Sequence, residues 1–420
     1  MTVVSRSDPY STTLDCGLRV VCARRPGAPV VAVVMLYGAG SVRDPSGLSG
    51  LAHLTEHMMF RGTTRFADGA IDELTNRLGG ANNAMTTNDY TAYYFVFPVE
   101  SWTVGVEIEI DRMSNCLLDA VAFETERSIA VEERQMLDDE PEAILEEALE
   151  KAAYGSHPYG LPIVGLMEDL ERATRDDLRR FYETWYAPSN AVLSVAGDVQ
   201  PDRVLELAGS ACASAAPASS RSMPDVSGKA PGRAAPTNVR LSRDSGIARL
   251  LVGFRCPEAL HEDSPAMELV AAVLGSGRSS RLYRRLVAGT PDVNDVSVDR
   301  MLQLYPGLFT VSADLSVGGD LSACEDAIMG ELVELAAAGP SVEEVAKAKR
   351  LWLMERSLGL ESALGLAGHL AFWKFVGGLP AGDEHARRVL AATPDDVARV
   401  TGVYLSPESR NSVWMTPETP

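Results

Sequence analysis

The sequence predicts an α+β protein built from two homologous domains, each consisting of a β-sheet and helices. A stretch rich in Ala, Ser, Pro and Gly, residues 213–236, shows neither helical nor strand periodicity and divides the 420-residue chain into two parts. The two parts end on similar sequences, residues 173–197 and 392–415. Both parts also contain strand-like segments followed by long amphipathic helices, for example at 123–153 and 341–376.

The similar chain ends justify the division into domains. Each begins with a threonine, Thr174 or Thr393, which suits a helix N-cap and is followed by acidic residues that favour a helix N-terminus. A helix pattern and a strand pattern then follow in both. We therefore expect an N-terminal domain at 1–212, a linker at 213–236 and a homologous C-terminal domain at 237–420.

Composition excludes several classes of protein. The net charge is −20, whereas nucleic-acid binding needs a basic surface, so we expect no nucleic-acid partner. No apolar run reaches the roughly 18 residues of a membrane span, and the N-terminus lacks a signal-peptide pattern. We expect a cytoplasmic protein without a membrane partner. The six cysteines form no CxxC pair, which predicts reduced thiols rather than a disulfide framework.

Candidate catalytic residues lie in His53-Leu54-Thr55-Glu56-His57, whose surroundings favour a helix. His53 and His57 are four positions apart, so both imidazoles lie on one face and can reach a common metal ion. Glu56 lies beside that centre and could act on a metal-bound water without being a ligand. This HxxEH order is the inverse of HExxH and predicts a Zn²⁺ site with Glu56 as the catalytic residue.

A third ligand is expected, because catalytic zinc usually takes three protein ligands and a water. The best candidate lies in the helical pattern ERSIAVEE at residues 126–133, where Glu126 and Glu133 face the same side. The residue pattern leaves both Glu132 and Glu133 open as the ligand.

Over nearly the whole chain these features resemble the M16 metallopeptidases, the family of pitrilysin, insulin-degrading enzyme and mitochondrial processing peptidase. In that family a ligand Glu follows HxxEH at the same spacing that separates His57 from Glu133 here, which is 75 intervening residues. The resemblance implies that Glu133 is the third ligand and that Glu126 is a supporting acid. It also implies the LuxS/MPP-like metallohydrolase fold and the short subfamily, whose members form clam-shell chambers from two chains.

A second resemblance concerns the substrate. Residues 83–87, NAMTT, resemble the family's NAxTS strand, which lies at a sheet edge and pairs with the substrate backbone. Asn83 and Ala84 are thereby expected to bind substrate. The family's activity implies a zinc endopeptidase in which Glu56 is the general base. Because edge pairing requires an extended backbone, unfolded peptides and leader or presequence segments are the expected substrates.

The second domain departs from the family pattern. Active members carry an Arg and a Tyr, seven residues apart, shortly after a motif like SRLxxxL. Ser280-Arg281-Leu282 aligns with that motif, which places Val287 and Asn294 at the two positions. We therefore expect a heterodimer in which a homologous M16 subunit supplies the Arg and Tyr. A homodimer is the weaker alternative.

A different class of function also stays open. Proteins with this fold also serve as non-catalytic scaffold or peptide-binding subunits, which usually lose the metal ligands. This chain retains His53, His57 and Glu133 together with Glu56, so the endopeptidase interpretation is preferred.

Overall fold

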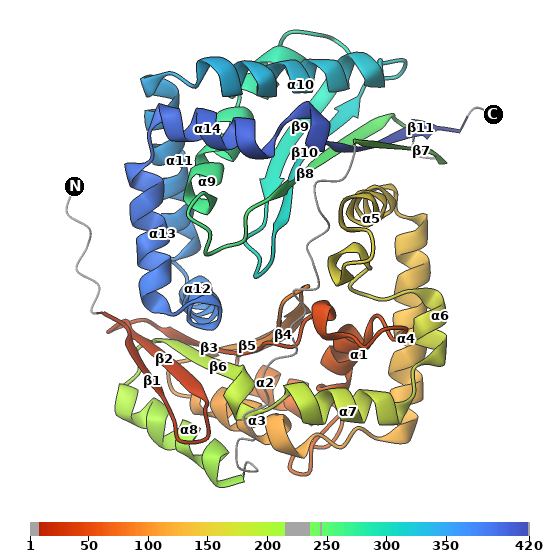
Figure 1. The fold of residues 1–420 in the computed structure, drawn as a ribbon. Coiled ribbons are helices and arrows are strands. Elements are labelled where there is room, and N and C mark those ends of the chain that lie inside the picture. The colour runs from red at the N-terminus through yellow and green to blue at the C-terminus, as the bar shows by residue number, and fades with distance from the viewer. Residues whose placement is uncertain (1–7, 215–235, 244–245, 419–420) are drawn as a thin grey trace. The chain divides into compact units, whose positions relative to one another are not determined.

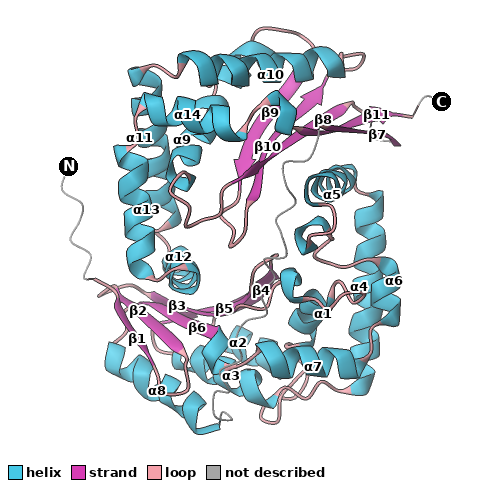
Figure 2. Cartoon of the chain, in the orientation of Figure 1, coloured by secondary structure: helices cyan, strands magenta, loops and turns pink. Residues whose placement is uncertain are grey.

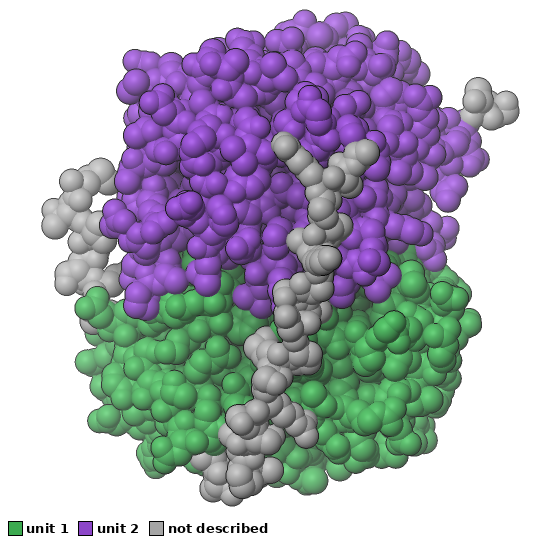
Figure 3. Space-filling view, viewed as in Figure 1, with its two compact units in different colours: residues 1–135, 162–226, 358–379 green, residues 136–161, 227–357, 380–420 purple. Residues whose placement is uncertain are grey.

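The computed structural model describes residues 8–214, 236–243 and 246–418, and these form two compact units (Figure 3). Neither unit is continuous in sequence. Unit 1 contains Met1–Gln135, Pro162–Val226 and Leu358–Leu379, and unit 2 contains Met136–Leu161, Ser227–Ser357 and Pro380–Pro420.

Unit 1 is built on a six-stranded sheet (Figure 1). In spatial order its strands are β1 (Tyr10–Thr13), β2 (Arg19–Arg24), β6 (Ala191–Gly197), β3 (Val30–Tyr37), β5 (Thr91–Pro98) and β4 (Ala81–Thr86). The pair β2–β6 is parallel and the other pairs are antiparallel. Strands β3 and β6 are nearly continuous apolar runs and are almost entirely buried, as expected when both faces of a sheet are covered.

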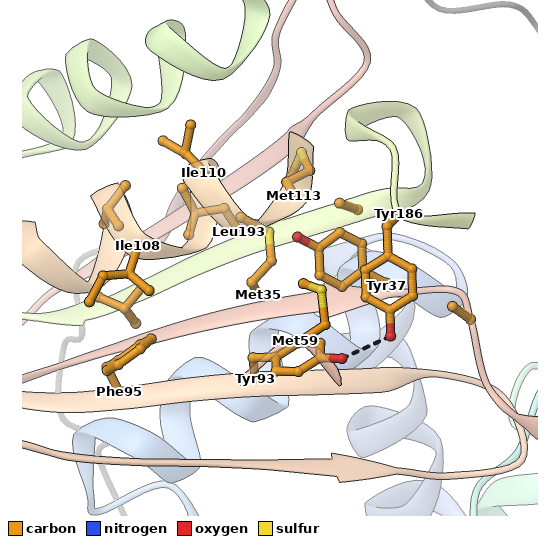
Figure 4. Packing of buried hydrophobic residues seen from close by; sticks show 14 of the residues in the cluster. Met35, Tyr37, Met59, Tyr93, Phe95, Ile108, Ile110, Met113, Tyr186 and Leu193 are labelled. Carbon is orange, nitrogen blue, oxygen red and sulfur yellow. Dashed lines mark hydrogen bonds between the residues drawn. The ribbon is translucent and has the colours of Figure 1, made fainter. Parts of the chain in front are cut away.

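Helices cover both faces of this sheet (Figure 2). On one face the side chains of Met35, Tyr93 and Phe95 pack with Ile108 and Leu193 in the main core (Figure 4). On the other face α12 contributes a second apolar cluster. The helices of unit 1 are α1 (Leu51–Met58), α2 (Ala70–Arg77), α3 (Thr103–Asn115), α4 (Ala120–Asp139, up to Gln135), α6 (Met167–Arg172), α7 (Arg175–Trp185), α8 (Pro201–Ser214) and α12 (Ala363–Val376), with short turns η1 (Ser41–Arg43) and η3 (Pro188–Asn190).

Unit 2 is built on a five-stranded sheet. In spatial order its strands are β7 (Thr237–Arg243), β11 (Asn411–Pro417), β8 (Arg249–Cys256), β10 (Gly307–Leu315) and β9 (Val293–Arg300). One face packs on a large apolar cluster, and the other is covered by α5 through Leu145 and Leu149. Its helices are α5 (Pro141–Tyr154), α9 (Ser264–Gly275), α10 (Leu321–Ala338), α11 (Val342–Gly359, up to Ser357), α13 (Leu379–Ala391, from Pro380) and α14 (Pro394–Tyr404), with the short elements η2 (Pro158–Gly160), η4 (Tyr283–Val287) and η5 (Pro407–Ser409).

The two sheets repeat one topology. The order β2-β6-β3-β5-β4 corresponds to β7-β11-β8-β10-β9, and in both the first pair is parallel and the rest are antiparallel. Thr174 and Thr393 both form capping boxes, with Asp177 and Asp396. The predicted α+β architecture of two homologous sheet-plus-helix domains is confirmed.

Each unit contains one helix that comes from the other half of the sequence. Helix α12 comes from the C-terminal half but packs on the sheet of unit 1, and α5 comes from the N-terminal half but packs on the sheet of unit 2. The domain boundaries at 1–212 and 237–420 remain a prediction, and most of the expected linker, residues 215–235, lies outside the described residues.

Two expectations from the sequence were wrong. The helices expected over 123–153 and 341–376 are each interrupted, because Pro141 lacks an N–H and starts α5, and Ser362 caps the start of α12. Cys16 is disulfide-bonded rather than reduced, since sequence spacing does not reveal which cysteines the fold brings together. Among the described helices, none is long and apolar enough to cross a membrane.

Candidate metal centre

Helix α1 carries the HxxEH motif and has an unusual start. Gly50 precedes it in the left-handed region with φ 90°, and a Cβ there would lie 2.2 Å from the Val164 carbonyl oxygen, so only glycine fits. The Asp44 carboxylate accepts hydrogen bonds from the backbone N–H groups of Gly50 and Ala52, each at 2.8 Å. A carboxyl group at this helix end satisfies donors that the helix leaves unpaired. Burial raises the pKa of Asp44 to about 8.

The helix buries one face and presents the other to the candidate site. Leu51, Leu54 and Met58 lie in the core of unit 1. The side chains of His53 and His57 are partly exposed, at 15% and 16%, and their ring centroids lie 4.5 Å apart. Both histidines therefore face a common, accessible point, as the i, i+4 spacing predicts.

Helix α4 brings Glu133 to the same point. Its Oε2 lies 3.7 Å from Nε2 of His53 and 3.7 Å from Nε2 of His57. Among the described residues, these three form the group of His, Cys, Asp and Glu side chains whose ligand atoms all lie within 4.8 Å of one another. Tetrahedral zinc with bonds of about 2.1 Å needs ligand atoms about 3.4 Å apart, so this donor set fits zinc.

The neighbouring Glu132 lies elsewhere. It is exposed and lines an open surface pocket with Arg127, Ser128 and Gln135. Since consecutive helical residues point about 100° apart, the two glutamates cannot exchange places. The geometry therefore favours Glu133 between the two candidates that the residue pattern left open.

The charge state of His53 suits metal binding. Burial and the adjacent His57 lower the pKa of His53 to about 3, so its imidazole is neutral near pH 7. Its Nδ1 is buried and has no hydrogen-bond partner among the described residues. Neutral imidazole is the form that binds a metal.

Glu126 contacts Nδ1 of His57, the ring nitrogen that does not face Glu133. Its Oε2 lies 2.9 Å from Nδ1 of His57, and its Oε1 accepts hydrogen bonds from the guanidinium of Arg61. The carboxylate is buried, with 4% of its side chain exposed. When Nδ1–H donates to Glu126, the lone pair of Nε2 points toward Glu133, which is the tautomer a metal ligand needs. Arg61 is a part of this arrangement that the sequence reasoning did not identify.

Glu56 lies beside the three candidate ligands but outside their group. Its Oε2 accepts a hydrogen bond from the Thr86 hydroxyl on β4. Burial raises the pKa of Glu56 above its ordinary value, although the bond from Thr86 opposes this effect. A carboxylate with a raised pKa is suited to exchange protons near neutral pH.

Asn83 and Ala84 lie on β4, at the edge of the sheet. They pair with Tyr94 and Tyr93 of β5, and no described strand pairs with the opposite edge. The Ala84 N–H donates to the Asn83 side-chain oxygen at 2.9 Å. The exposed edge of β4 and the metal centre lie in the same unit, joined by the contact between Thr86 and Glu56.

In unit 2 the positions of the expected Arg and Tyr carry neither group. Val287 ends the π-helical turn η4 and packs against the core of unit 2. Asn294 lies on β9, where its side-chain oxygen accepts a hydrogen bond from Ser316 at 2.8 Å. Neither side chain supplies a cation or a phenol.

This duplicated fold brings two histidines and a glutamate together in a candidate metal site. Residues 19–166 match the family model described as Insulinase (Peptidase family M16), and residues 172–351 match the model described as Peptidase M16 inactive domain. The chain belongs to peptidase family M16.

Named relatives agree with this assignment. The chain is 27% identical to zinc protease PqqE of Helicobacter pylori over 410 residues, covering 97% of this chain and 92% of that protein. It is 30% identical to the uncharacterized zinc protease YmxG of Bacillus subtilis over 279 residues, covering 65% of each. A crystal structure of a protease from Helicobacter pylori superposes with a TM-score of 0.93 at 27% identity, covering 98% of this chain and all of that one.

Proposed function

We propose that this chain is the zinc-bearing subunit of an endopeptidase that cleaves extended peptides, such as unfolded peptides and leader or presequence segments. The observation that carries the proposal is the convergence of His53, His57 and Glu133, with Glu56 beside them. Relatives named zinc proteases support zinc as the metal.

The proposed ligands are His53 and His57 through Nε2 and Glu133 through its carboxylate. Bound zinc would supply an acidified water and polarise a peptide carbonyl. Glu126 holds the ring of His57 in the required tautomer through the bond to Nδ1.

Glu56 is the proposed general base. Its carboxylate is free of the ligand group and is held by Thr86. It accepts a proton from the attacking water and delivers it to the leaving amine. A partly buried carboxylate with a raised pKa can do both within one reaction cycle.

The edge of β4 is the proposed peptide-binding element. An extended peptide that adds to this edge forms backbone hydrogen bonds beside Asn83 and Ala84. Such pairing recognises backbone rather than side chains, so the substrate must be extended at the point of cleavage. A compact folded protein does not offer a free strand of this kind.

A homologous M16 subunit is the proposed partner. It would supply the Arg and the Tyr, because this chain has Val287 and Asn294 at those two positions. Loss of donors aimed at a developing oxyanion lowers the rate about 10²- to 10³-fold per group. The isolated chain should therefore bind zinc normally but cleave peptides slowly. A homodimer is the alternative assembly. A cytoplasmic location is a further proposal; the disulfide at Cys16 disagrees with it, because disulfides are rare in cytosolic proteins.

The alternative function is a non-catalytic scaffold or peptide-binding subunit. The test is to measure zinc per chain and cleavage of an unstructured peptide by this chain alone and with a homologous M16 partner. One zinc per chain and cleavage that rises with the partner support the endopeptidase. Zinc-free chains, or zinc-loaded chains that bind the peptide without cleaving it in either form, support the scaffold. Full activity alone, unchanged by the partner, refutes the heterodimer.

A further inference from the structure

Thr86 lies where the peptide-binding edge meets the candidate catalytic residue. It is the last residue of β4, two positions beyond Ala84, so both side chains lie on the same face of the sheet. Its hydroxyl contacts Oε2 of Glu56. The Thr86 hydroxyl is the donor in this bond and the Glu56 oxygen is the acceptor.

The backbone of Thr86 points toward the free edge of the sheet. Thr87 donates its N–H to the Tyr90 carbonyl at 2.8 Å, so Thr87 and Tyr90 form a hydrogen-bonded pair of the β4–β5 hairpin. Such pairs alternate with pairs whose backbone groups point outward. Thr86 and Ala84, opposite Thr91 and Tyr93, are therefore outward-pointing positions.

Two contacts agree with this register. The Ala84 N–H is bonded to the Asn83 side chain, as expected for a donor that has no strand partner on that side. The hydroxyl oxygens of Thr86 and Thr91 lie 3.1 Å apart, and facing side chains approach closest in pairs that are not hydrogen-bonded.

The Thr86 hydroxyl lies against the buried side chain of Thr91. Thr91 is fully buried and donates its hydroxyl proton to the Ala39 carbonyl at 3.0 Å. The next buried layer contains Tyr93 and Tyr186, whose hydroxyls are 2.8 Å apart (Figure 4). The β-branched Thr86 has few χ1 rotamers, and this packing fixes its hydroxyl toward Glu56.

We propose that Thr86 is a positioning residue that couples peptide docking to Glu56, because its backbone pairs with the docked peptide while its hydroxyl holds the Glu56 carboxylate. The inference rests on the proposed peptidase function. A peptide paired at Ala84 and Thr86 is then aligned by the same residue that aligns the general base. Positional errors near 1 Å at a catalytic group lower rates by about 10²-fold.

The experiment compares three variants of the full chain, assayed with its M16 partner. Thr86→Val keeps the backbone and the branched shape but removes the hydroxyl, and Thr86→Ser keeps the hydroxyl. Thr75→Val is the control, because Thr75 is a buried threonine of unit 1 whose hydroxyl donates within its own helix, to the Ile71 carbonyl at 2.8 Å. Zinc content and thermal unfolding are measured for each.

We expect Thr86→Val to lower kcat about 10- to 100-fold while KM stays within about 3-fold. Zinc content should not change, and Thr86→Ser and Thr75→Val should retain most activity. A second readout is the visible spectrum of the cobalt-substituted chain, which should change in Thr86→Val and not in Thr86→Ser or Thr75→Val, because the Glu56 carboxylate beside the metal loses its support.

The outcomes separate this inference from the proposed function. Wild-type cleavage combined with an unchanged kcat in Thr86→Val, a loss confined to KM, or equal losses in Thr86→Val and Thr86→Ser overturns the role of Thr86 and leaves the peptidase intact. If the wild type cleaves nothing, the peptidase function fails, and the cobalt spectrum decides the position of Glu56: an unchanged spectrum in Thr86→Val overturns the inference as well.

Discussion

Replacing Glu126 by Gln tests whether the buried carboxylate behind His57 tunes the metal site. The two oxygens of Glu126 face donors on both sides, the Arg61 guanidinium and Nδ1–H of His57 at 2.9 Å. A glutamine of the same shape must turn its NH₂ group toward one of these donors. If it faces His57, the imidazole must move its proton to Nε2, the atom proposed to bind zinc.

The magnitude follows from this geometry. Loss of a carboxylate that orients a ligating histidine typically weakens metal binding about 10- to 100-fold. Because a tenfold change corresponds to about 1.4 kcal/mol, Glu126→Gln should weaken zinc binding by about 1.4–2.8 kcal/mol. The burial of Glu126 excludes water as a ready substitute, which favours the upper part of this range.

The assay is zinc affinity measured by competition with a chromophoric chelator. Glu124→Gln is the matched control, since Glu124 lies on the same helix but is exposed and pairs with Arg127. We expect the control to bind zinc like the wild type. An affinity of Glu126→Gln equal to that of the control would refute the supporting role of Glu126.

The remaining predictions concern the third ligand, the partly buried Glu150 and the start of α1. Glu133→Gln should release zinc at chelator concentrations that leave Glu132→Gln loaded, and the reverse order would move the ligand by one residue. Burial, together with Glu146 and Glu147, raises the pKa of Glu150 to about 8. Folding therefore favours the protonated form, and the free energy of unfolding falls as pH rises from about 4.5 to 8. Denaturant unfolding of Glu150→Gln should lack this loss, and pH profiles identical to those of the wild type would contradict the prediction. Asp44→Ala should lower the free energy of unfolding by about 1 kcal/mol in the same assay, whereas an unchanged value would show that the α1 N-terminus needs no carboxylate.

The sequence predicts those features that depend on local chemistry. The N-caps at Thr174 and Thr393 were expected from the residue type and the acids that follow, and the common face of His53 and His57 follows from helical spacing. The strand at Asn83 was also expected, from its resemblance to the family motif. In each case the partners are close in sequence, or a known pattern relates them.

Features that depend on distant partners were not predicted. An apolar stripe shows that α12 must be covered but does not say by which sheet, so its packing on unit 1 could not be read from its period. Asp44 reaches α1 across a loop, and Arg61 reaches Glu126 from the bend that follows α1. The sequence identifies Thr86 only as part of a strand motif, whereas the structure places its hydroxyl in contact with Glu56.

The most direct test of the central claim is a paired measurement on Glu56→Gln: bound zinc and peptide cleavage, both compared with the wild type in the presence of the M16 partner. The amide keeps the shape of the side chain and removes the base. We predict one zinc per chain, as in the wild type, and a rate lower by about 10²- to 10⁴-fold or more. Loss of zinc would show that Glu56 is a ligand, and retained cleavage with zinc bound would show that it is not the base; either result contradicts the account.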